Sequence, residues 1–171
     1  NGGALGFLPP ATIVNRNTTQ YWFQIQKDGG WCFPGAELFQ PGIGRFMTST
    51  HTATPTSGYL DVFNASGTLI WSAASAATMP RIQGFLTVPA ATDLSTAITV
   101  TSPVANPWFC WSQCPGNLSD DGETIGYSGI VIRRNSSTSF SLQYVSKNQK
   151  TYRQAMGNNG FQIALATFTG Y

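Results

Sequence analysis

Hydrophobic and polar residues alternate along most of the chain, as expected for strands with one buried face. In the segment QYWFQIQ (20–26), Tyr21, Phe23 and Ile25 share one face. The segments TSFSLQYVS (138–146) and FQIALAT (161–167) alternate in the same way. Successive side chains of a strand point to opposite faces of a sheet, so each segment predicts a strand with one face in the core.

Further strands are predicted where short apolar segments are separated by turn residues. They cover residues 11–15, 43–48, 81–88, 96–101, 107–111 and 125–134. Turns rich in Asn, Asp and Gly, which adopt positive φ readily, predict hairpins at 23–33, 60–71 and 153–165. Short strands at this spacing predict an all-β fold, an antiparallel β-sandwich or jelly-roll-like domain.

Helical periodicity is almost absent from the sequence. The best candidate is SAASAATM (72–79), which is rich in alanine and is followed directly by Pro80. A proline removes a backbone donor and ends a helix, so this segment is either one helical turn or an exposed loop. It does not change the prediction of an all-β fold.

The length and composition indicate one domain over residues 1–171. No linker, charged block or low-complexity run divides the 171 residues. Charged residues make up only 9% of the chain, against about 25% in a typical protein, and Ser and Thr are abundant instead. This composition is typical of extracellular or virion β proteins. The N-terminal segment has no basic region and is therefore not an intact signal peptide, although an earlier signal could have been removed.

Charge and hydropathy argue against two classes of partner. The net charge of +2 is too small to predict binding to nucleic acid. No apolar run reaches the roughly 20 residues that a membrane helix needs, so membrane insertion is not expected.

The stretch YLDVFNASGTLIWSAASAATMPRIQGFLTV (59–88) resembles a pattern in small tail-associated proteins of tailed bacteriophages. In that pattern, a hairpin has the sequence aliphatic-x-Val-Phe-Asn/Asp-x-Ser-Gly at its turn and continues into an apolar strand. A short spacer, an Arg and a Gly-containing strand come next. The matching residues are Leu60, Val62, Phe63, Asn64, Ser66, Gly67, Leu69, Ile70, Arg81 and Gly84. The resemblance implies a structural or adhesion component with other virion proteins, or copies of itself, as partners. It covers about 30 residues and implies no catalytic residue.

Aromatic residues supply candidate contacts for a partner or a ligand. Trp108 and Trp111 lie three positions apart, so on a strand they fall on opposite faces and one is expected to reach the surface. Trp22 lies opposite the apolar face of its own strand, so it either packs in a second layer or is exposed. Tyr127 completes this set. Aromatic rings stack on sugars and dominate protein interfaces, so these four residues are candidates for binding a partner or a cell-surface glycan.

Three cysteines leave their pairing open. Cys110 and Cys114 are close in sequence, but a straight strand would hold their Cα atoms about 13 Å apart, so a disulfide requires a turn between them. Free, buried thiols are the favoured alternative. Zinc would need Cys32 and His51 as well as these two, and no paired C-x-x-C motif is present, so no metal is expected.

The acidic residues Asp120, Asp121 and Glu123 form the one acidic cluster of the sequence. A solvated loop is the favoured interpretation, and Ca²⁺, which prefers oxygen ligands, is a weaker one. Side chains of adjacent residues tend to point apart, which argues against a glycosidase pair at 120 and 121. The one histidine, His51, lies in a Ser- and Thr-rich loop, and no G-x-S-x-G motif occurs. We therefore expect neither enzymatic activity nor a cofactor.

These observations favour a non-enzymatic bacteriophage virion protein of the tail tip or fibre region, acting in assembly or in attachment to the host surface. The alternative is a secreted, lectin-like β-sandwich that binds carbohydrate through its exposed aromatic residues.

Overall fold

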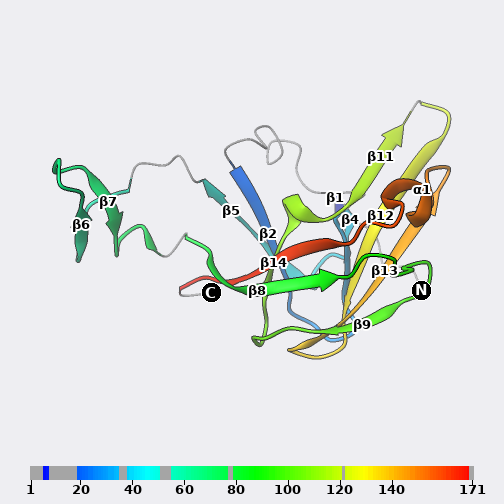
Figure 1. Ribbon diagram of the computed structural model, residues 1–171, viewed down its shortest axis with the longest axis horizontal. Helices are drawn as coiled ribbons and strands as arrows, with labels where there is room; N and C mark the ends of the chain where they lie inside the picture. The colour runs from blue at the N-terminus through cyan, green and yellow to red at the C-terminus, as the bar shows by residue number, and fades with distance from the viewer. Residues whose placement is uncertain are drawn as a thin grey trace.

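The computed structural model describes residues 6–7, 19–34, 38–50, 55–76, 79–120 and 122–169. Antiparallel strands form two larger sheets and one separate hairpin (Figure 1). Side chains from the two larger sheets enclose a common core. The prediction of an all-β, antiparallel sandwich is therefore confirmed.

The first sheet, here called sheet A, has seven strands in the order β1-β4-β3-β12-β13-β9, and β11 pairs with β12 beside β3. Its strands are β1 (Gly6–Phe7), β3 (Trp31–Phe33), β4 (Leu38–Phe39), β9 (Ile98–Thr101), β11 (Gly116–Asp120), β12 (Ile125–Arg134) and β13 (Ser139–Lys147).

The second sheet, here called sheet B, has five strands in the order β5-β2-β10-β14-β8. Its strands are β2 (Thr19–Ile25), β5 (Gly44–Thr50), β8 (Arg81–Val88), β10 (Trp108–Cys110) and β14 (Phe161–Thr167). The 3₁₀-helix η4 (Trp111–Gln113) follows β10 directly.

The core lies between the two sheets and is built around aromatic rings. Phe23 of β2 stacks on Phe109 of β10, with ring centroids 5.2 Å apart. Phe109 meets Phe140 of β13 edge to face at 4.9 Å, which connects sheet B with sheet A. Ile132 and Leu142 of sheet A are fully buried in the same cluster. Together these contacts remove the apolar face of each sheet from water.

The strand predictions agree closely with the structure in sheet B and along β12. The predicted ranges 81–88, 125–134 and 161–167 coincide with β8, β12 and β14. The prediction at 107–111 is one residue longer than β10 at each end. The predicted strand at 11–15 lies outside the described residues, and β11 was not predicted. The predicted hairpin at 23–33 is wrong, because β2 belongs to sheet B and β3 to sheet A, and the two strands do not pair.

The predicted hairpin at 153–165 is wrong in its first half. Residues Tyr152–Met156 form the α-helix α1 instead of a strand. The reason is a capping box: the Thr151 side chain accepts from the Gln154 backbone, and the Gln154 side chain accepts from the Thr151 backbone N–H at 2.9 Å. The other helical candidate, at 72–79, forms turns over residues 73–76 and no α-helix among its described residues.

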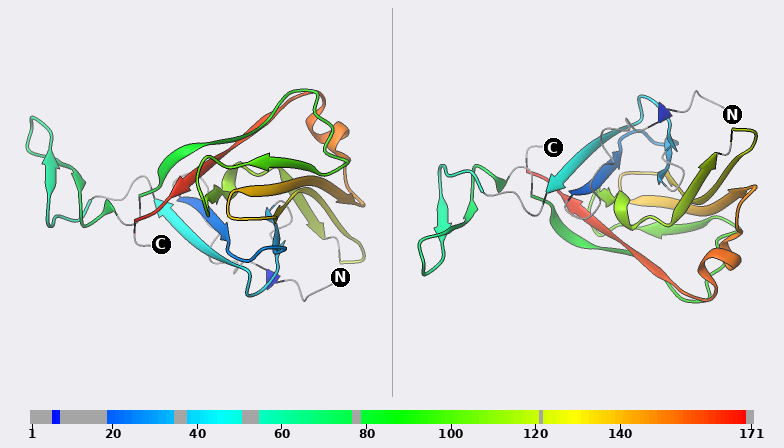
Figure 2. Two further views of the ribbon diagram at one scale, coloured as in Figure 1. Left: turned by 90° about the horizontal axis from the view of Figure 1, so that it is seen from below. Right: turned by 90° about the horizontal axis from the view of Figure 1, so that it is seen from above.

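Strands β6 (Asp61–Phe63) and β7 (Leu69–Ser72) form the separate hairpin. It projects from one end of the sandwich, beyond the ends of β5 and β8 between which it is inserted (Figures 1 and 2). We call the described segment 55–76 the arm.

Candidate assembly site

The arm is a short hairpin held together by its own hydrogen bonds. Its two strands pair from Asp61 with Ser72 to Phe63 with Leu69, and a register shift lies between Val62 and Phe63. At the base, the Ala73 N–H donates to the Leu60 carbonyl at 2.8 Å. The predicted hairpin at 60–71 is thus confirmed, but it does not join either sheet of the sandwich.

Asn64 fixes the tip of the arm. Its side-chain Oδ1 accepts from the backbone N–H groups of Ser66 at 3.0 Å and of Thr68 at 2.8 Å. Gly67 has a φ of 77°, a left-handed conformation that glycine adopts without strain. The Asn-x-x-Gly sequence therefore specifies this turn locally, without help from the sandwich.

Asp61 organises the base of the arm. Its carboxylate accepts hydrogen bonds from the Ser57 hydroxyl and, at 3.0 Å, from the Gly58 N–H. The hydrogen bond from Ser57, followed by that from Gly58, lowers the pKa of the Asp61 carboxyl. The base consequently carries a negative charge at neutral pH.

The arm exposes an unusual amount of apolar surface. Its exposed large side chains have relative exposures from 44% to 102%: Tyr59, Leu60, Val62, Phe63 and Ile70. Monomeric soluble proteins rarely expose large contiguous apolar patches, and such patches usually mark interaction sites. The arm is therefore the first candidate for a functional surface.

The outer face of sheet A carries a second candidate surface, an apolar groove of about 570 Å³. Trp31 and Phe33 of β3 form one side, where Phe33 meets Tyr127 of β12 edge to face at 5.6 Å. Val131 and Val145 lie against this aromatic cluster. Polar lining is supplied by Arg133, Ser141, Gln143 and Ser146. We call this surface the sheet A groove.

Two of the four aromatic residues predicted to bind a partner are buried. Trp22 and Trp108 are each 1% exposed, and both pack edge to face on Phe168. Trp22 belongs to the packed interior, and the expectation that it contacts a ligand at the surface is corrected. Trp108 is equally buried, and it reaches only the wall of a polar hollow that Arg45 and Arg134 also line. The reason is that Phe168, which follows β14, covers this side of sheet B.

The other two aromatic residues differ in their surroundings. Trp111, in η4, is partly exposed and packs against Phe23 and Phe46 at centroid distances of 5.4 Å. Tyr127 lines the sheet A groove. The structure thus leaves Tyr127 on a concave surface and packs it against Phe33, whereas Trp111 lies elsewhere, beside β2 and β5.

The three cysteines are free thiols, so the candidate disulfide between Cys110 and Cys114 does not form in this structure. The chain does turn between them, because η4 intervenes, and the Cys114 thiol donates to the Cys110 carbonyl at 3.5 Å. Burial raises the pKa of all three thiols, and neighbouring Cys32 and Cys110 contribute to the rise at Cys114. Protonated, buried thiols are poor nucleophiles and poor metal ligands.

The remaining sequence candidates fall largely outside the described residues. His51 and Asp121 are not described, and neither is the side chain of Asp120, so the Ca²⁺ candidate is represented by Glu123 alone. Among the described residues no group of His, Cys, Asp and Glu is arranged to hold a metal ion. No helix in the described part of the chain is long and apolar enough to span a membrane.

Sequence reasoning missed the sheet A groove and the projection of the arm. Trp31 and Phe33 alternate with buried Cys32, which is a signal of an apolar outer face. That signal is short, and the groove requires β3 and β13 to flank β12, a pairing that is not local in sequence.

Comparison with curated proteins finds no match, and neither does comparison with solved structures. One family model does match, and it covers residues 1–170. The match extends over almost the whole chain, so the protein belongs to the family described as a domain of unknown function, DUF8377.

Proposed function

We propose that this protein is a non-enzymatic structural component of a bacteriophage virion, in the tail tip or fibre region, and that its arm joins it to a second copy of itself. The observation that carries the proposal is the apolar surface of the arm, which projects away from the sandwich. The bacteriophage context rests on the resemblance of residues 59–88, a stretch that includes most of the arm.

The energetics favour an arm that is covered in its working state. A lone two-stranded hairpin is at best marginally stable in water. Covering its apolar side chains stabilises the complex by about 25 cal/mol for each Å² removed from water. Docking against another subunit therefore supplies the core that the arm lacks.

A second copy offers a suitable surface in the sheet A groove. Both surfaces are largely apolar, and each contains a charge of opposite sign: Asp61 on the arm and Arg133 in the groove. Figure 1 shows the arm at one end of the molecule and β12 and β13 toward the other end. A contact between two different surfaces of this kind is head-to-tail and generates rings or filaments.

The virion assignment is tested with an antibody to this chain, coupled to gold and applied to purified particles from the source culture. Gold at the tail end, seen by electron microscopy, supports the proposal. Gold on the head contradicts the tail assignment and indicates capsid decoration. Unlabelled particles contradict a place in the virion.

Carbohydrate binding is the second candidate, because Trp31 and Tyr127 line the sheet A groove together with Gln143 and Ser141. Aromatic faces beside polar side chains are suited to sugar rings. The test is a glycan titration monitored by Trp fluorescence, with Tyr127→Ala as the variant and Ile125→Ala as an exposed control on the same strand. Saturable quenching that only Tyr127→Ala removes, with self-association unchanged, would favour this candidate over the arm.

A further inference from the structure

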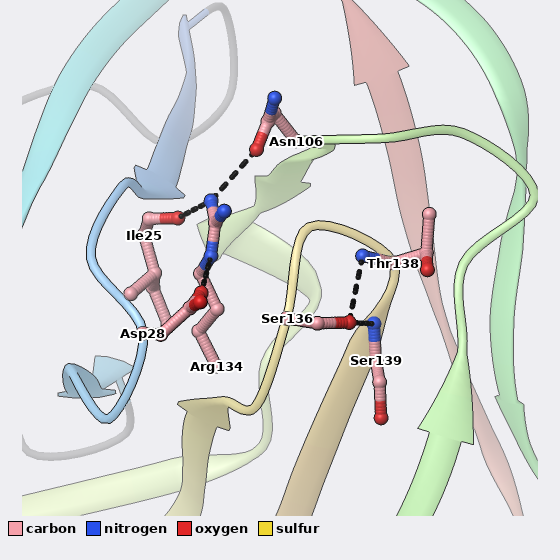
Figure 3. Close-up of polar contacts among 7 residues, drawn as sticks. All are labelled: Ile25, Asp28, Asn106, Arg134, Ser136, Thr138 and Ser139. Atoms are coloured by element: carbon pink, nitrogen blue, oxygen red, sulfur yellow. Dashed lines mark hydrogen bonds and ion pairs between the residues drawn. The ribbon is translucent and has the colours of Figure 1, made fainter.

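A polar hollow in the sandwich brings two arginines together. Arg134, the last residue of β12, has a side chain that is only 10% exposed. Its Nε donates to the Asp28 carboxylate at 2.7 Å, and its Nη1 donates to the Ile25 carbonyl at 2.9 Å and to Asn106 Oδ1 at 2.7 Å (Figure 3). Within the described part of the chain, Nη2 has no hydrogen-bond acceptor.

Arg45, on β5, is held in place by Gln24 and Trp108. Its Nη2 donates to Gln24 Oε1 at 2.7 Å, and its guanidinium lies 5.3 Å from the centre of the Trp108 ring. Gln24 Nε2 in turn donates to the Asn106 carbonyl at 2.6 Å. Gln24 and Asn106 therefore connect the two guanidinium groups in one hydrogen-bonded network, which fixes their orientation.

The hollow between these groups has a volume of about 440 Å³. Its lining is mainly polar and includes Gln24, Gln26, Arg45, Asn106, Arg134 and Thr167. The charged residues in the lining are Arg45 and Arg134, and both are positive. Asp28, which pairs with Arg134, is not part of the lining. A guanidinium group with unused N–H donors is suited to pairing with a carboxylate, and the hollow is lined by two of them.

We propose that this hollow binds a carboxylate-bearing sugar, such as a uronic or sialic acid. The arginines supply the contacts to the carboxylate. The amides of Gln24, Gln26 and Asn106 and the hydroxyl of Thr167 offer both donors and acceptors, as the hydroxyl groups of a sugar ring require. The volume lies within the range of small-molecule sites. This site is separate from the arm and from the sheet A groove, and it goes beyond the assembly function.

The test is a titration of the full chain with D-glucuronate and N-acetylneuraminate, monitored through the NMR signals of the Gln24, Gln26 and Asn106 side-chain amides. Glucose supplies the ring without the carboxylate, and acetate supplies the carboxylate without the ring. We expect saturable shifts of these signals with at least one acidic sugar, and much weaker binding of glucose and acetate. No shifts with either acidic sugar at about 10 mM would overturn the proposal. Acetate binding as tightly as the sugars would overturn the sugar assignment, and equal binding of glucose would remove the role of the arginines.

Two variants and one control assign the effect to the hollow. Arg45→Gln should weaken binding about tenfold, because it removes a charge-assisted contact. Asp28→Asn should tighten binding about threefold, because it removes a nearby negative charge without touching the lining. Arg153→Gln, on α1, makes the same change of charge away from the hollow and should leave binding unchanged. Unchanged affinity in both test variants, or equal losses in Arg45→Gln and Arg153→Gln, would contradict the proposal.

Discussion

Phe140 and Phe63 both lie on antiparallel strands, but their surroundings are opposite. Phe140 of β13 is 1% exposed and packs against Phe109 across the sandwich. Phe63 of β6 is 54% exposed, at the end of a hairpin with no second layer of its own. The sandwich thus completes its core within one chain, whereas the arm presents the same kind of side chain to its surroundings.

The difference shows that a strand pattern specifies a hairpin but not the surface that covers it. In the sandwich, that covering surface is another sheet of the same chain. For the arm, we propose that it is a neighbouring copy. The two regions should therefore respond very differently to mutation, and the following predictions use that contrast.

The largest effect is expected in the core. Phe140→Ala should lower the free energy of unfolding by about 3–5 kcal/mol, because it leaves a cavity between the sheets. Phe63→Ala should change it by less than about 0.5 kcal/mol in the monomer, because the side chain is exposed. Urea unfolding at low protein concentration measures both values. Similar losses for the two variants would show that the arm is packed against the sandwich in solution.

The next effect concerns Arg134 and its neighbour. Arg134→Met leaves the Ile25 carbonyl and Asn106 Oδ1 without a donor and should cost about 2 kcal/mol or more. Arg133→Met, one residue earlier and exposed, should cost less than about 0.5 kcal/mol. Thermal unfolding monitored by circular dichroism compares them. If Arg133→Met lowered the free energy of unfolding as much as Arg134→Met, the hydrogen bonds of Arg134 to Ile25 and Asn106 would not be the source of the stabilisation.

A smaller effect, confined to the arm, is expected at its tip. Asn64→Ala removes the acceptor for the Ser66 and Thr68 N–H groups and should destabilise the hairpin by about 1 kcal/mol. Amide hydrogen exchange should accelerate in the arm and not in β12 or β13. Asn64→Asp retains an acceptor oxygen and serves as the conservative control. Faster exchange in the sandwich as well would show that the arm and the sandwich unfold together.

The smallest effect at neutral pH involves the thiols, all of which lie in the sandwich. Burial raises their pKa values above the ordinary value of 9.0, so the folded state favours the protonated form. This stabilisation is complete below pH 9 and is lost as the pH rises through the raised folded-state pKa values. A thiol reagent at pH 8 should react slowly with the native protein and rapidly with an Ile70→Cys variant on the arm. Rapid reaction of Cys32 or Cys110, the two buried thiols, at pH 8 would contradict their burial.

Much of the sandwich could be predicted from the sequence because its strands alternate strictly. The ranges of β8, β12 and β14 follow from period-2 patterns, and the tip of the arm follows from Asn64 and Gly67. These features depend on neighbouring residues along the chain. Helix α1 was missed because the capping interaction between Thr151 and Gln154 outweighed the strand-like pattern after it.

The candidate sites were harder to predict because they depend on pairing between distant segments. The sheet A groove forms only when β3 and β13 flank β12, and the polar hollow unites Arg45 with Arg134 across two sheets. The burial of Trp22 and Trp108 depends on Phe168, far along the chain. Alternation places a side chain on a face, but it does not say what covers that face.

The most direct test of the central claim is sedimentation velocity of the purified chain over a range of concentrations. The wild type should form assemblies larger than a monomer. The double variant Phe63→Asp/Ile70→Asp should sediment as a monomer, because charges on the arm oppose its burial against a second copy. Phe85→Asp, 53% exposed but on β8 of sheet B, is the control and should assemble like the wild type. A wild type that stays monomeric at all concentrations, or a double variant that assembles normally, would contradict the account.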